Sequence, residues 1–176
     1  TVFTPKNFTD SLSMAAIKLT ATRVVYTPDY VGIDYPMGDV PVNTGVCTDV
    51  IIRAYRAMGV DLQKELHEDI KNFPNRYPNI DRADHNIDHR RVPNLANFFT
   101  EYAEVLEVSN NTTNYKAGDI IYWKGHVALC VNSKKLIHAY GPKKKVVVMN
   151  IKKTINEIEK NSNLKVKFIK NESNYR

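Results

Sequence analysis

The segment that decides the fold is residues 45–59, GVCTDVIIRAYRAMG. Behind Cys47 the apolar side chains recur at helical spacing, and Gly59 stands where a glycine commonly ends a helix. The pattern predicts a helix over about 47–58 that buries one face and carries Cys47 in its first turn. A helix N-terminus has partial positive charge and unpaired N–H groups, which favour thiolate over thiol. Cys47 is therefore a candidate nucleophile; the alternative is the small apolar filler that a free cysteine usually is.

A second informative segment lies about eighty residues downstream. Residues 119–123, 126–132 and 135–140 are short apolar runs separated by brief turns that contain Gly, Lys or Asn, which predicts an antiparallel meander. His126 opens the second run and His138 lies in the third, so the two can be cross-strand neighbours. A histidine beside a thiol can take its proton, and a second polar group can orient that histidine.

These blocks resemble a known family. GDII at 118–121, GHVAL at 125–129 and LIHA at 136–139 are similar to the C-terminal half of the NlpC-type, papain-like cysteine peptidases of bacterial cell walls. The longer stretches GVCTDVIIRAYRAMGVDLQKELHEDI (45–70) and DHNIDHRRVPNL (84–95) resemble a bacterial branch of that superfamily whose domain has no known function. The resemblance covers about residues 26–140.

The resemblance implies a papain-like α+β fold and a cysteine hydrolase that cleaves an amide bond, with peptidoglycan stem peptides as substrate and no cofactor. In that family the helix-start cysteine is the nucleophile, which is Cys47 here. The first histidine, His126, is the base, and a polar residue twelve positions later, His138, orients it. A tyrosine about twelve positions before the cysteine often shapes the oxyanion site, which points to Tyr35.

Two departures leave the substrate open. Cell-wall enzymes commonly have Asp before the cysteine and Ser-Gly after it, whereas this chain has Val46 before it and Thr48-Asp49 after it. Residues 61–105 form a long insertion between the nucleophile helix and the sheet. The alternatives are an amidase or acyltransferase acting on another acyl or lipid group, and a cell-wall-binding module with an idle triad.

The insertion contains a polar loop with competing interpretations. Residues 84–91 hold two Asp and two His, which suit zinc or manganese, so a metal-dependent protein centred on His85 and His89 is a third alternative. Helical His-Glu-x-x-His spacing is missing, and Asp in loops commonly caps turns, so we expect no metal site. Arg90 and Arg91 offer planar forks to carboxylates and are candidate substrate-binding residues. Alternatively, one or both pair with the aspartates of this loop.

Composition bounds the class of protein. The chain has 176 residues, which suits one domain, and lacks an apolar run of the ~18 residues that a membrane span needs. The net charge is +6, but the lysines are scattered on turns without a nucleic-acid-binding motif, so we expect a solvated surface and no nucleic-acid partner. We also expect a monomer, and Cys130 as an apolar strand filler rather than a disulfide partner. No signal segment is visible in the sequence, and export to the periplasm or cell envelope is an expectation from the resemblance alone.

The remaining elements follow from periodicity and from breaker residues. We expect a helix over 7–23 capped by Thr9 or Asp10, and a loop over 26–45. Further helices are expected at 61–71, 94–102 and 151–159, and further strands at 105–108, 145–150 and, as an edge strand, 164–169.

Overall fold

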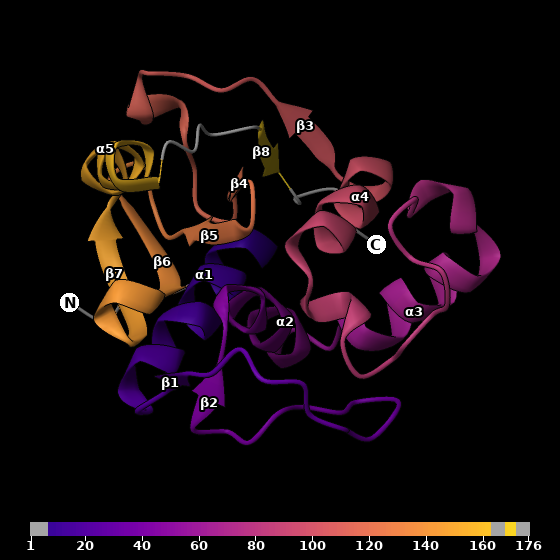
Figure 1. Cartoon of the computed structure of the whole chain (residues 1–176). Helices are drawn as coiled ribbons and strands as arrows, with labels where there is room; N and C mark the ends of the chain where they lie inside the picture. The colour runs from indigo at the N-terminus through magenta and orange to yellow at the C-terminus, as the bar shows by residue number, and fades with distance from the viewer. Residues whose placement is uncertain (1–6, 163–167, 172–176) are drawn as a thin grey trace.

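The structure is a computed structural model that describes residues 7–162 and 168–171 (Figure 1). The helices are α1 (Phe8–Lys18), α2 (Cys47–Ala57), α3 (Leu62–Asn72), α4 (Val92–Tyr102) and α5 (Ile151–Ser162). The strands are β1 (Val25–Tyr26), β2 (Thr44–Gly45), β3 (Glu104–Leu106), β4 (Ile120–Trp123), β5 (His126–Cys130), β6 (Lys135–Tyr140), β7 (Lys145–Asn150) and β8 (Phe168–Asn171). Four of the described helices precede the strands of the main sheet, α5 follows β7, and the sheet is antiparallel, which is the predicted α+β class.

The main sheet has six strands in the order β3-β8-β4-β5-β6-β7, and its neighbours pair antiparallel. Strands β4 to β7 form the predicted meander, because each connection is only a few residues long. The tightest turn joins Trp123 to His126 through Gly125, whose φ of 82° suits a residue without Cβ.

One strand prediction was wrong in position. Of the expected edge strand over 164–169, residues 164–167 lie outside the described residues, and the strand found at Phe168–Asn171 pairs with β3 and β4 on its two sides. Strand β8 is therefore interior, and β3 forms that edge of the sheet. Alternation within a strand cannot reveal this, because an interior strand can show the same period of two as an edge strand.

The sheet divides two apolar clusters. One face packs on α2 and its neighbouring helices, with Ile51, Leu129 and Ile137 among the buried members. The other face packs under α5, and Cys130 is fully buried there beside Leu136. Because side chains alternate across a strand, odd and even positions of β5 and β6 enter different clusters. Cys47 and Cys130 consequently belong to different clusters, and both are free thiols.

The helix ends show which local signals were correct. Gly59 follows α2 with a φ of 83°, as expected of a helix-ending glycine. Helix α1 is capped by Asn7, whose side-chain oxygen accepts the N–H of Asp10 at 2.9 Å, and not by Thr9 or Asp10. All three residue types make good caps, so only the backbone geometry separates them.

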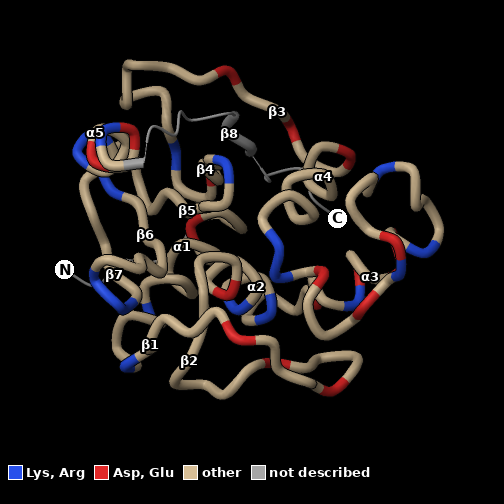
Figure 2. The backbone as a smooth tube through the Cα atoms, in the orientation of Figure 1, with Lys and Arg blue, Asp and Glu red and all other residues tan. Residues whose placement is uncertain are grey.

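Lysine and arginine residues are spread over helices, strands and turns, and three consecutive lysines lie between β6 and β7 and at the start of β7. Lys143 and Lys144 lie in the connection between β6 and β7, and Lys145 begins β7 (Figure 2); all three are exposed. Within the described residues, no helix is both long enough and apolar enough to cross a membrane.

Candidate active site

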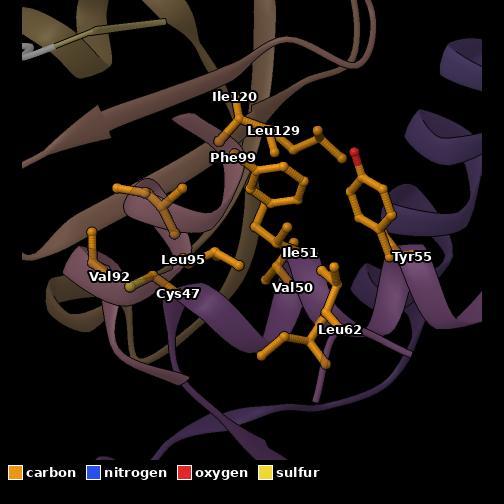
Figure 3. Packing of buried hydrophobic residues seen from close by; sticks show 14 of the residues in the cluster. Cys47, Val50, Ile51, Tyr55, Leu62, Val92, Leu95, Phe99, Ile120 and Leu129 are labelled. Atoms are coloured by element: carbon orange, nitrogen blue, oxygen red, sulfur yellow. The ribbon is translucent and has the colours of Figure 1, made fainter. Parts of the chain in front are cut away.

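Cys47 is the first residue of α2, and only 4% of its surface is exposed. Figure 3 shows it at the margin of the core cluster, next to Val92. The backbone N–H of Val127, on β5, hydrogen-bonds the Cys47 sulfur. Burial raises the pKa of the thiol to about 11, although this N–H and those of the first helical turn act to lower it. The N–H groups at the helix start favour the thiolate, as the sequence predicted, but desolvation has the larger effect and the resting group is a thiol.

The two predicted histidines are in contact. His126 Nε2 lies 2.8 Å from His138 Nδ1, and His138 Nε2 lies 3.1 Å from the sulfur of Met149. Since one hydrogen bond uses His126 Nε2, its Nδ1 is the nitrogen left for another partner. Burial lowers the pKa of His126 to about 4 and that of His138 to about 3, where His126 also contributes. Both rings are neutral at pH 7.

Strand register explains why a spacing of twelve residues brings these rings together. Leu129 pairs with Ile137, and continuing this register sets His126 opposite Tyr140 and diagonal to His138. The even-numbered positions of both strands point to the same face, and diagonal neighbours are within reach of aromatic rings. The Tyr140 ring stacks on His138 at 4.8 Å with an interplanar angle of 11°, which fixes the plane of the second imidazole.

A cavity of about 330 Å³ opens at Cys47. Tyr26, from β1, lines it together with Arg91 and Gly125. The pKa of the Tyr26 hydroxyl is raised by burial and, next, by the charge of the Cys47 thiolate. Tyr26 is therefore close enough to the sulfur for a thiolate charge to act on its hydroxyl.

Tyr35 does not take the place predicted for it. Its ring packs edge-on against His67 at 5.0 Å and against His85 at 5.3 Å, and it is not among the residues that line the Cys47 cavity. The parallel β1–β2 pair explains the difference, since it sets Tyr26 opposite Gly45, two residues before the nucleophile. Counting residues back from Cys47 did not find Tyr26, because β1 and β2 are joined by a loop, and distance along a loop does not fix position in space. The run of apolar residues ending at Tyr26 was the available signal.

Arg90 is an internal ion-pair partner. Its guanidinium binds Asp49 of α2 through two hydrogen bonds of 3.0 Å, and both side chains are almost fully buried. Thr48 donates its hydroxyl to the backbone carbonyl of Arg90 at 2.7 Å. The departure from the cell-wall pattern after the cysteine thus has a structural role, because Thr48 and Asp49 hold the insertion. Arg90 was a candidate for binding substrate, with pairing to Asp84 or Asp88 as the alternative; its guanidinium is instead paired with Asp49 of α2.

Arg91 has a different environment. It is exposed, it lines the Cys47 cavity, and its guanidinium makes no hydrogen bond or ion pair with any described residue. Its carbonyl accepts the N–H groups of Asn94 and Leu95, so its backbone begins α4. Of the two arginines, the structure brings only Arg91 to the cavity as an uncompensated cation.

The histidines and aspartates of the loop do not converge. Asp84 and Asp88 accept backbone N–H groups of Asn86 and Asp84 at 2.9 and 2.6 Å, as turn-capping residues do. His85 packs near Tyr35, whereas His89 is buried and has a pKa of about 3, because of burial first and of Arg90 next. Among the described residues, no group of three or more His, Cys, Asp or Glu could hold a metal ion.

The helix with an N-terminal cysteine on an antiparallel sheet defines the class as a papain-like fold of the NlpC type. The chain is similar to the solved structure of NlpC2 from Trichomonas vaginalis, with a TM-score of 0.52 and 14% sequence identity. The match covers 99% of this chain and 51% of the NlpC2 chain. Residues 13–170 match the family model DUF1287, described as a domain of unknown function, and the chain belongs to that family. The predicted fold class and NlpC-type branch are thereby confirmed.

The chain is also similar in sequence to a curated protein. The uncharacterized protein YijF of Escherichia coli (strain K12) is 52% identical over 107 residues, which cover 58% of this chain and 52% of YijF. The chain spans about half the length of YijF and of NlpC2. At 14% identity, the likeness to NlpC2 concerns the fold.

Proposed function

We propose that this protein is a cysteine hydrolase that cleaves an amide bond in peptidoglycan stem peptides. The observation that carries the proposal is the meeting of two elements. The Cys47 sulfur is hydrogen-bonded by the N–H of Val127, and the adjacent residue, His126, is in contact with His138. The N–H of Val127 joins the thiol to the strand that begins at His126, and Gly125, the residue before that histidine, lines the cavity of about 330 Å³ at Cys47.

The protonation states indicate how such a site would work. With a thiol pKa of about 11 and a His126 pKa of about 4, the resting pair is neutral rather than an ion pair. His126 then acts as a general base, taking the Cys47 proton as the sulfur attacks the substrate carbonyl. The imidazolium returns that proton to the leaving amine, and water, deprotonated by His126, hydrolyses the thioester. His138 holds the plane and tautomer of His126 through the bond to Nε2.

The tetrahedral intermediate needs hydrogen-bond donors at its oxyanion. The backbone N–H of Cys47 and the hydroxyl of Tyr26 are the candidates, with Tyr26 in the role that sequence spacing assigned to Tyr35. Export to the cell envelope and action as a monomer belong to the same proposal.

One observation favours a second candidate function. The 4% exposure of Cys47 and its raised pKa are also expected of a cell-wall-binding module whose triad is idle. An idle site would bind peptidoglycan without releasing fragments from it.

The deciding experiment is digestion of purified peptidoglycan followed by mass spectrometry of the soluble fragments. The wild type should release peptides cut at one amide position, and Cys47→Ala should release at least about a thousandfold less. Cys130→Ala is the matched control, because Cys130 is buried in the other cluster and should retain activity per folded molecule. Equal fragment release by wild type and Cys47→Ala would reject the hydrolase, and sedimentation with the insoluble wall without release would support the idle module.

A further inference from the structure

The cavity at Cys47 is electrostatically one-sided. Its lining contains two arginines and, among the described residues, no carboxylate. Asp49 neutralises Arg90 through a paired hydrogen bond, so Arg91 contributes the unbalanced positive charge. The rest of the lining is mainly apolar, with Pro28, Val46, Ile87 and Val92. An apolar pocket with one convergent charge is the usual form of a small-molecule site, and here the charge selects an anion.

The backbone that carries Arg91 is fixed relative to the nucleophile. The residue before it is held to the first turn of α2 twice, by the Thr48 hydroxyl on the Arg90 carbonyl and by Asp49 on the Arg90 guanidinium. The residues after it begin α4 through hydrogen bonds to the Arg91 carbonyl. Arg90 is thus a positioning residue, and it holds the backbone of Arg91, whose side chain is unpaired among the described residues, beside Cys47.

Asp88 is the nearby carboxylate that could pair with Arg91 in place of a substrate. Arg91 contributes to lowering the pKa of this carboxyl, but burial has the larger effect and leaves the pKa raised. Asp88 is 2% exposed, and its Oδ2 accepts the N–H of Asp84 at 2.6 Å, so it is already used inside the loop. No ion pair joins Arg91 to a carboxylate within the part of the chain that the structure describes.

We propose that Arg91 determines the specificity of this cavity by binding a free carboxylate of the substrate, one or two residues from the scissile amide. The short separation follows from size, because Arg91 and Cys47 line the same cavity of about 330 Å³, near the lower end of the ~300–1,000 Å³ of ligand sites. A planar guanidinium binds a carboxylate through two parallel hydrogen bonds, which an amide in the same place cannot match. The inference rests on the proposed function for the identity of the bond that is cleaved.

The test compares two peptides: a stem tetrapeptide released from peptidoglycan with its carboxylates free, and the same peptide with them converted to primary amides. For the wild type, kcat/KM should favour the free acid by about ten- to hundredfold. Arg91→Gln should lose that preference by raising KM for the acid alone, and Arg91→Lys should retain part of it, since lysine keeps the charge without the fork. Arg82→Gln, an exposed arginine of the same insertion, is the matched control and should behave as the wild type.

A binding measurement on Cys47→Ala separates this inference from the proposed function. Titration calorimetry should show tighter binding of the acid than of the amide, and the double variant Cys47→Ala/Arg91→Gln should bind both equally. If the wild type cleaves neither peptide but this binding difference is found, the hydrolase fails and the carboxylate site stands. If the wild type cleaves both peptides alike and Arg91→Gln changes nothing, the hydrolase stands and the carboxylate site is overturned. Equal binding of both peptides to Cys47→Ala also overturns it.

Discussion

The meander and the insertion both border Cys47, but they are built by different rules. In the meander, strands β5 and β6 bring His126 and His138 to 2.8 Å through a register that the spacing of apolar residues already indicates. In the insertion, residues 61–105, the side chains that matter most are placed by partners far away in the sequence. Arg90 pairs with Asp49, forty-one positions earlier, and the same contact delivers Arg91 to the cavity.

This contrast separates residues suited to catalysis from residues suited to substrate selection. Strands and helices hold catalytic groups at constant distances from one another. A loop that a few buried contacts attach to this scaffold can change its other side chains without disturbing those distances. We therefore expect substitutions in the meander to change the chemical step. Substitutions in the insertion should change stability or substrate binding, according to which side chain is removed.

The largest expected effect is in the meander. His126→Ala should lower kcat by about 10²–10⁴-fold, because the base that takes the Cys47 proton is lost. His138→Ala should cost less, and His138→Gln should recover part of the loss, since an amide can still hydrogen-bond His126 Nε2. These rates are measured on the peptidoglycan fragments released per folded molecule.

The control for this prediction is a histidine of the insertion. His67→Ala removes a ring that packs on Tyr35 and His85, outside the cavity lining, and should leave kcat unchanged. A loss with His67→Ala as large as that with His126→Ala would remove the division between the two regions.

The next effect is on stability and separates the two arginines. Arg90→Gln should lower the free energy of unfolding by about 3–5 kcal/mol, because it leaves the Asp49 carboxylate buried without its partner. Arg91→Gln should change it by no more than about 0.5 kcal/mol, since that side chain is exposed and unpaired among the described residues. Urea unfolding measures both values, and Asp49→Asn/Arg90→Gln should recover part of the first loss. Equal losses for the two arginines would contradict the assignment of Arg90 as internal and Arg91 as free.

The smallest expected effect is a loss of folding stability at acid pH. A histidine in the unfolded chain titrates near pH 6.5, whereas folded His89 has a pKa of about 3, because of burial and of nearby Arg90 and Arg56. Below pH 6.5 the unfolded state therefore binds a proton that the folded state does not, and stability falls as pH falls. Between pH 7 and pH 5 this should cost about 2 kcal/mol for His89 alone.

The measurement is urea unfolding at both pH values for wild type and for His89→Leu. The variant should lose about 2 kcal/mol less than the wild type over this range, if removal of the titrating ring is the cause. His126→Ala is the matched variant in the meander. Burial lowers the pKa of His126 to about 4, so this variant should also lose less stability than the wild type between pH 7 and pH 5. If His89→Leu and the wild type lose the same free energy, His89 is not the neutral, buried histidine described.

Much of the candidate site could be predicted from the sequence because it depends on local periodicity. Helical spacing after Cys47 set that residue at the start of α2, and Gly59 ended the helix. Alternation in two short runs, with turns too short for any other connection, made His126 and His138 neighbours. A pattern repeated over several residues survives small errors in each position, which is why these predictions held.

Local patterns in the sequence were sufficient for the order of elements, the papain-like class, the helix start at Cys47 and the contact between His126 and His138. The packed structure was needed to show that Tyr26 rather than Tyr35 lines the cavity and that β8 lies inside the sheet. It was also needed to show that Arg90 is internal, whereas Arg91 is unpaired among the described residues. It also decided the protonation of Cys47, since the helix N-terminus is visible in the sequence but the depth of burial is not. The physical reason is common to all of these. Pairing between distant segments and desolvation depend on the whole packed chain, whereas periodicity is a property of a few consecutive residues.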